Sequence, residues 1–171
     1  MDGVRAAAFD RRVVAVHEGG HVIAAQHFGA EAFGMIWFEG GCWRGSADIP
    51  GVDEMPPDQR RVIGVAGAAA LMTWLNIPAE AFFSNRLGVS ASDWKLIGVV
   101  PGRSNIVVLR ESLAFTLDLL KRERPALIAM SRQIISESKH HARETVQQAR
   151  LSRSSGRHRR EPSQVTLGSA W

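Results

Sequence analysis

Two histidines and a glutamate near the N-terminus constrain the local fold more than any other stretch: His17-Glu18-Gly19-Gly20-His21. This H-E-x-x-H spacing places both imidazoles on the same face of an α-helix, one turn apart, where they can hold one Zn²⁺ ion. Glu18 then lies beside that face and can accept a proton from a water molecule on the metal. The pattern therefore predicts a helix with His17 and His21 as metal ligands and Glu18 as the catalytic base.

Apolar periodicity around this stretch extends the expected helix from an N-cap at Asp10 to a stop at Gly29. Gly19 and Gly20 each cost such a helix about 1 kcal/mol relative to alanine. We therefore expect another backbone, or a bound substrate, to approach the helix closely on their side. A second helix, 57–75, is rich in Gly and Ala and slim enough to make that approach.

The remaining segments predict a mainly α fold of the α+β class, with a small β-hairpin or short sheet. Turn residues and periodicity indicate two strands and several helices. The strands are Phe33–Phe38 and Arg44–Ile49; the helices are a short piece after Pro78, one capped by Ser90 or Ser92, one from Ser104 to about Lys121, and one that Pro125 opens.

The charge distribution divides the chain in two. Residues 1–138 have the size of one ordinary domain, whereas residues 139–171 carry seven Lys/Arg against two Glu, a net charge of +5 in a chain of +4 overall. This basic C-terminal extension is expected to be helical at first and disordered from about Ser152. It offers nucleic-acid binding as an alternative function. Trp171 is its only aromatic residue and it has no recognition motif, which disfavours that alternative.

Three features indicate a cytoplasmic protein without a membrane span. The first twelve residues lack the apolar core of a signal peptide, and the single cysteine, Cys42, fits a reducing compartment. The uncharged run from Val62 to Ala79 is long enough to cross a bilayer. Its high Gly and Ala content, together with Asn76 and Pro78, favours a buried helix of a soluble core instead.

A catalytic zinc site needs a third protein ligand, and the residues leave three candidates. His27 would complete the metzincin pattern, but Ala24 stands where that pattern has a helix-breaking glycine, so a continuing helix carries His27 away. Glu80 and Asp93 each follow a segment that can pack on the first helix, and spacing alone leaves both open. Asp93 also suits the first turn of a helix without any metal.

Three stretches, taken in order, resemble the peptidase domain of the FtsH-type zinc metalloproteases: 17–21, 65–70 and 88–93. That family has a His-Glu-Ala-Gly-His helix, a Gly-Gly-x-Ala-Ala-Glu helix and a Thr-Gly-Ala-Ser-Asn-Asp loop whose aspartate is the third zinc ligand. The resemblance covers about residues 10–138. It implies a helical zinc-metallopeptidase domain in which Asp93 completes the site with His17 and His21.

The chain departs from the family pattern at several points. Leu71 stands where the family has the glutamate of its second motif, which removes an acid near the site. The segment after Asp93 is short and broken by Pro101. No G-x-x-x-x-G-K-[ST] phosphate loop occurs in the 171 residues, so the ATPase motor of the family is not expected here.

Together these features predict a zinc-dependent endopeptidase that hydrolyses unfolded or exposed protein segments without a motor of its own. We expect the peptide to add to the edge of the Phe33–Phe38 strand. Analogy with the family also brings a homo-oligomer and a separate ATPase partner into consideration. The alternative is a regulatory binding module on the same fold. Glu18 argues against a module that does not cleave, because binding alone needs no base.

Overall fold

The computed structural model describes residues 2–85, 89–99 and 105–138, which belong to one compact unit, Met1–Ser138. The sequence-based expectations for residues 139–171, and the capping role of Ser104, fall outside these described residues.

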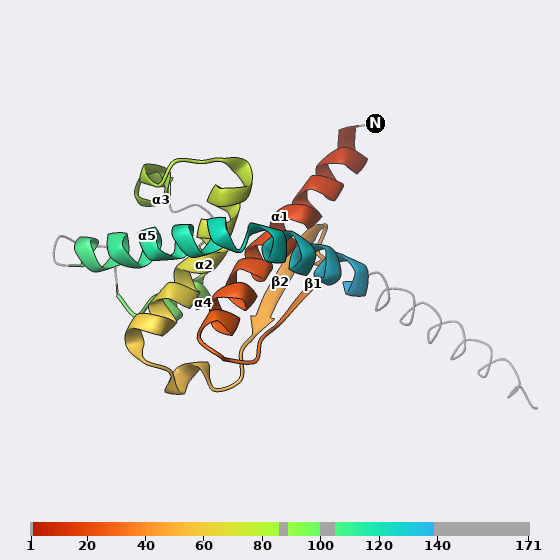
Figure 1. Cartoon of the computed structure of the whole chain (residues 1–171). Helices are drawn as coiled ribbons and strands as arrows, with labels where there is room; N and C mark the ends of the chain where they lie inside the picture. Colours follow the sequence, from red (N-terminus) through yellow and green to blue (C-terminus); the bar gives the residue numbers. More distant parts are fainter. Residues whose placement is uncertain (1, 86–88, 100–104, 139–171) are drawn as a thin grey trace, which may run out of the picture. The chain divides into compact units, whose positions relative to one another are not determined.

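Within the described ranges the fold is mainly helical with one antiparallel hairpin, which confirms the fold class expected from the sequence (Figure 1). The elements in chain order are α1 (Asp2–His27), β1 (Phe33–Glu39), β2 (Cys42–Asp48), a 3-10 turn at Val52–Glu54, α2 (Pro57–Leu75), α3 (Glu80–Asn85), α4 (Ala91–Ile97) and α5 (Ile106–Arg122). Residues 124–138 form a further helix.

The first helix is longer than the sequence suggested. The expected start at Asp10 is wrong, because α1 begins at Asp2. Residues 6–8 are three alanines, the residue type with the highest helix propensity, and they let the helix run through the expected cap. Its C-terminal end at His27, just before the left-handed Gly29 (φ 79°), agrees with the expected stop.

Small residues bring α1 and α2 into close contact. A Cβ atom on Gly20 would collide with the carbonyl oxygen of Ala66 and lie 2.6 Å from the Cβ of Ala70, so only glycine fits at this crossing. Gly19 lies against a different helix. A Cβ atom on it would contact the side chains of Leu127 and Ser131 in the helix 124–138. The expected close approach of another backbone is therefore confirmed at Gly20, whereas Gly19 faces only side chains.

The uncharged run in the middle of the chain forms part of the protein core, as expected. Residues 62–70 of α2 are all buried, and α5 packs against the same helix with Leu109, Leu113 and Leu120. None of the described helices is both long and apolar enough to cross a membrane. α2 is thus the central helix against which α1, α4 and α5 pack.

The hairpin covers one side of α1. Its strands pair from Phe33↔Asp48 to Glu39↔Cys42, and Gly40 and Gly41 make the turn with positive φ angles of 60° and 83°. Such a two-residue turn matches the natural twist of paired strands. Alternate residues point inward onto α1 and the helix 124–138, which brings β2 close to the histidine-bearing part of α1.

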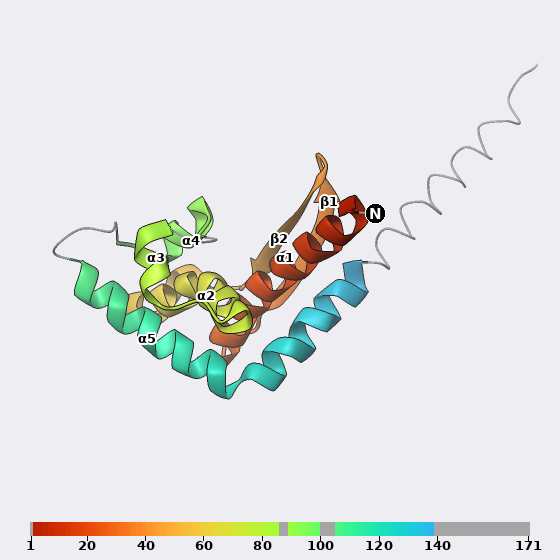
Figure 2. The same ribbon diagram turned by 90° about the horizontal axis from the view of Figure 1, so that it is seen from above.

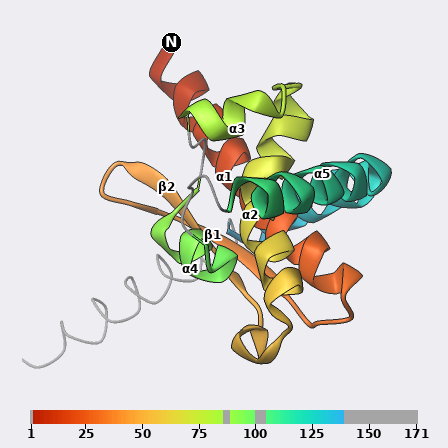
Figure 3. The same ribbon diagram turned by 90° about the vertical axis from the view of Figure 1, so that its left-hand side faces the viewer.

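The chain turns sharply after α5, and the helix 124–138 runs back towards α1 (Figure 2). Arg11 links α1 to this helix, because its Nη2 donates a hydrogen bond of 2.6 Å to the carbonyl oxygen of Ile135. α4 packs against α2 and lies next to the hairpin (Figure 3). This placement carries the residues of the 88–93 stretch towards α1.

Candidate metal centre

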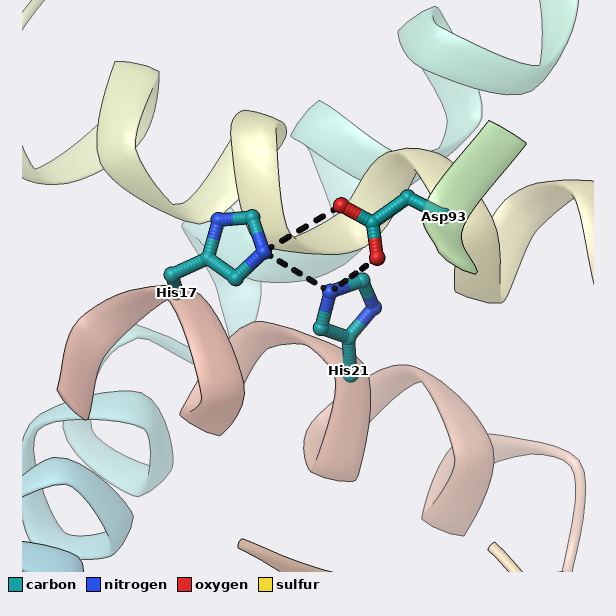
Figure 4. A group of neighbouring side chains, drawn as sticks. All are labelled: His17, His21 and Asp93. Atoms are coloured by element: carbon teal, nitrogen blue, oxygen red, sulfur yellow. Dashed lines mark hydrogen bonds and ion pairs between the residues drawn. The ribbon is translucent and has the colours of Figure 1, made fainter. Parts of the chain in front are cut away.

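His17 and His21 extend from one face of α1 towards the carboxylate of Asp93, which comes from α4 (Figure 4). The Nε2 atoms of the two histidines lie 3.1 Å apart. Oδ2 of Asp93 is 3.4 Å from Nε2 of His17, and Oδ1 is 3.3 Å from Nε2 of His21. The three side chains therefore converge on one point and form a group that can hold a metal ion.

The three side chains are close enough together for one metal ion to contact all of them. Bonds of about 2.0–2.1 Å from zinc to nitrogen or oxygen, set at tetrahedral angles, place neighbouring ligand atoms roughly 3.3 Å apart. The 3.1 Å between the two Nε2 atoms lies close to that value. The distances of 3.4 and 3.3 Å to Asp93 involve its two different oxygens, and one ligand atom from each residue gives a group within 4.8 Å. Two imidazoles and one carboxylate also leave a fourth position for water or substrate, as catalytic sites require.

A backbone group of α2 orients His21. Its Nδ1 lies 2.7 Å from the carbonyl oxygen of Ile63, and both groups are buried. Because a carbonyl oxygen only accepts hydrogen bonds, Nδ1 must carry the proton in this pair. The lone pair of Nε2 is then free to face the common point, an arrangement typical of metal-binding histidines.

Asp93 is held in place by the start of its own helix. Ser90 is the N-cap of α4, and its side-chain oxygen accepts a hydrogen bond of 3.1 Å from the backbone N–H of Asp93. In return the N–H of Ser90 donates to Oδ2 of Asp93 at 2.7 Å, which completes a capping box. Of the two expected caps, Ser90 is the correct one, and Asp93 serves helix capping and the site together.

Charge interactions favour the ionised form of this cluster. Burial alone would raise the pKa of Asp93, but hydrogen bonds from His17 and His21, the charge of His21 and the Ser90 N–H lower it well below its ordinary range. Burial likewise acts to lower the pKa of His21, yet the hydrogen bond and charge of Asp93 and the charge of Glu18 raise it. Asp93 and His21 thus each favour the charged form of the other.

The α2 helix leaves room for both imidazoles at one glycine. A Cβ atom on Gly67 would collide with the ring of His17 and with Nε2 of His21. A turn earlier on α2, Gly64 lets the backbone of Asp93 and Ile97 approach in the same way. The small residues of α2 therefore allow the histidines and the aspartate to meet.

Glu18 lies at the border between the site and the hairpin. It is only 7% exposed, and its side chain packs where Gly45 of β2 has no side chain. Burial raises the pKa of the Glu18 carboxyl, while the neighbouring His21 and His17 partly oppose that rise. Glu18, His17, His21 and Asp93 all line one pocket of about 180 Å³.

The strand next to this pocket is β2, not β1. Gly45, Ser46 and Ala47 of β2 line the pocket, and no residue of β1 does so. The Phe33–Phe38 strand, to which we expected a peptide to add, therefore does not border this pocket. β1 pairs with the far side of β2, so β2 lies between β1 and the site.

A second, more apolar pocket of about 250 Å³ adjoins the first. His17, Glu18 and Gly45 contribute to both pockets. The rest of its lining is Arg44 and four apolar side chains: Val13, Val14, Trp43 and Leu71. Leu71, the position at which the chain departs from the family glutamate, thus makes this neighbouring space apolar.

The other candidate ligands lie elsewhere. α1 continues without a break through Ala24, and His27 at its end is exposed and packs against the ring of Phe115 at 5.8 Å between ring centroids. Glu80 begins α3 and lines a different pocket, shared with Arg110 and Lys121 of α5. The structure brings neither residue into the group with His17 and His21.

The sequence did not single out two residues that support the site, Ile63 and Gly67. Ile63 acts through its backbone oxygen, so its residue type says nothing about that role. Gly67 was visible only as one of several small residues in a slim helix.

No protein-family model matches the chain, and no curated protein is significantly similar to it.

Proposed function

We propose that this protein is a zinc-dependent endopeptidase in which His17, His21 and Asp93 bind the metal and Glu18 is the general base. The observation that carries the proposal is the convergence of two imidazole nitrogens and a carboxylate at separations of 3.1–3.4 Å. The H-E-x-x-H spacing, the buried glutamate and the order of the three family-like stretches support it.

Zinc is the metal that best suits both the ligands and the base. Two histidines and one carboxylate also form the ligand set of non-haem iron sites. A carboxylate directly after the first histidine, inside the same pocket, is what hydrolysis requires and what oxygen chemistry does not. Bound zinc would supply a Lewis acid that polarises a peptide carbonyl and acidifies a water molecule.

Glu18 would move the proton during hydrolysis. Its carboxylate lies in the pocket beside both histidines and can take a proton from the attacking water. The same carboxylate would then hand that proton to the nitrogen of the leaving amine, which otherwise departs as an unstable anion. This role accounts for a buried glutamate at a position where metal binding alone needs no acid.

The substrate would lie along β2. The edge of β2 that is not paired with β1 borders the pocket through Gly45, Ser46 and Ala47, and its backbone groups can align an extended peptide. A pocket of about 180 Å³ admits a peptide strand but no folded domain. Unfolded segments and exposed loops are therefore the expected substrates.

Metal analysis of the purified protein tests the proposal first. About one zinc per chain is expected; Asp93→Ala should abolish zinc binding, while Glu80→Ala, at the rival position, should retain it. Iron in place of zinc, or full zinc binding by Asp93→Ala, would contradict the proposed centre.

The variant Glu18→Gln distinguishes a peptidase from a binding module that does not cleave. The variant should keep its zinc but hydrolyse casein about 10²–10⁴-fold more slowly, the usual contribution of a general base. Equal behaviour of the wild type and this variant on many unfolded substrates would favour the regulatory module.

Nucleic-acid binding through residues 139–171 stays an alternative. It is tested by asking whether the chain binds DNA in a salt-sensitive way and whether truncation after Ser138 removes that binding.

A further inference from the structure

A larger pocket of about 520 Å³ lies away from the metal centre. It is bordered by α1, the C-terminal end of α2 and the helix 124–138, which lie close together in Figure 2. Val16, Leu127 and Ile135 supply an apolar floor, and Arg12, Arg124 and Arg132 stand around it. We call it the three-arginine groove. None of His17, Glu18, His21 and Asp93 lines it.

The charge of this groove has one sign. All three arginines are exposed, and no Asp or Glu is among the described residues that line the groove. None of the three forms an ion pair with another described residue. An anionic ligand would therefore gain guanidinium contacts without displacing an ion-pair partner from the described part of the chain.

The spacing of the arginines defines the shape of a complementary ligand. Arg124 and Arg132 are eight residues apart on one helix, which places their backbones about 12 Å apart along its axis. Leu127, on the groove floor, lies between them in the sequence. An extended peptide covers that distance in about four residues, at roughly 3.3 Å each.

We propose that the three-arginine groove binds an acidic peptide segment of another protein, with apolar side chains on the floor and a carboxylate near each end. The volume falls within the range of about 300–1,000 Å³ found for ligand pockets. The C-terminal extension of this chain, with its net charge of +5, has the wrong sign for the site. The proposal does not depend on the metal centre or on the proposed peptidase activity.

Fluorescence anisotropy with two labelled peptides tests the inference on the full chain. The probe is Asp-Leu-Ile-Leu-Glu, and its control is Lys-Leu-Ile-Leu-Lys, both measured with a chelator present so that hydrolysis cannot occur. The acidic probe should bind at least tenfold more tightly than the basic one, and added salt should weaken it because guanidinium–carboxylate contacts at an exposed rim are screened.

Charge reversal at the groove supplies the decisive comparison. The double variant Arg124→Glu with Arg132→Glu should lose at least tenfold in affinity for the acidic probe and gain affinity for the basic one. Arg122→Glu is the matched control, because Arg122 is also exposed but does not line the groove. Its affinity for the acidic probe should stay within about twofold of the wild type.

Three results would overturn the inference. The first is equal binding of both probes, or acidic-probe binding that the double variant leaves unchanged. The second is binding that begins only when residues 139–171 are removed, which would make that segment the occupant. The third is a dimer that the double variant dissociates while no probe binds, which would make a second copy the occupant. Each is read in the absence of metal, so a failed peptidase assay has no bearing on it.

Discussion

The carbonyl oxygen of Ile63 lies 2.7 Å from Nδ1 of His21, so the backbone of α2 sets the direction of a histidine on α1. The same helix leaves space for both imidazoles at Gly67 and receives the backbone of Asp93 at Gly64. α2 therefore supports all three converging side chains although none of the three belongs to it. Changes in α2 should therefore affect the proposed metal centre without altering any of its three proposed ligands.

Gly67→Ala should weaken zinc binding by at least about tenfold, the scale found when support around metal ligands is lost. The new methyl group would occupy the space of both imidazoles, while alanine does not weaken the helix itself. Zinc affinity is measured by competition with a coloured chelator. Gly19→Ala is the matched control, because its methyl group would face Leu127 and Ser131 and not the site. Similar affinities for the two variants would refute this role of α2.

Ser90→Ala should both destabilise α4 and loosen Asp93. The substitution removes the acceptor of the Asp93 backbone N–H, and loss of an N-cap typically costs about 1 kcal/mol. We expect a reduction in zinc affinity of up to about tenfold, measured by the same competition. Ser92→Ala, at the exposed hydroxyl next to it, should have a smaller effect. The reverse order would show that the capping box does not position Asp93.

Gly20→Ala should reduce the stability of the whole domain. Its methyl group would meet the backbone of Ala66 and the side chain of Ala70, so α1 and α2 would have to separate. Overpacking of this kind costs about 1–3 kcal/mol of unfolding free energy, measurable by urea denaturation of the metal-free protein. Gly19→Ala, one residue away, should cost less, and equal losses would contradict the close crossing at Gly20.

Leu71→Glu should change the choice of substrate. If a side chain next to the cleaved bond enters the apolar pocket, peptides with leucine there should have a kcat/KM about 10–100-fold higher than peptides with aspartate. The introduced carboxylate would add a charge to that pocket and should reduce the ratio towards one. Val107→Glu, on the exposed surface of α5, is the control and should leave the ratio unchanged. A wild-type enzyme indifferent to the two peptides would exclude this pocket as a subsite.

Local patterns predicted the elements well because the interactions behind them span only a few residues. The H-E-x-x-H helix, the hairpin with its Gly40-Gly41 turn and the cap at Ser90 all follow from contacts within about four positions. The start of α1 was the main error. Asp10 is a favourable N-cap, but the alanines before it have a high helix propensity and the helix continues through them. Short-range rules do not say which of these two preferences is stronger.

The sequence alone determined which residue types can bind a metal and that two of them share a helical face. It left Glu80 and Asp93 open on spacing, and only the resemblance to a known family singled out Asp93. Tertiary structure decided that Asp93 comes to the histidines and that β2, not β1, borders the pocket. The contacts responsible join distant segments, such as His21 and Ile63 at a separation of 42 residues. They arise because α1 and α4 both pack closely against α2. The spacing of residues in the sequence does not predict this packing.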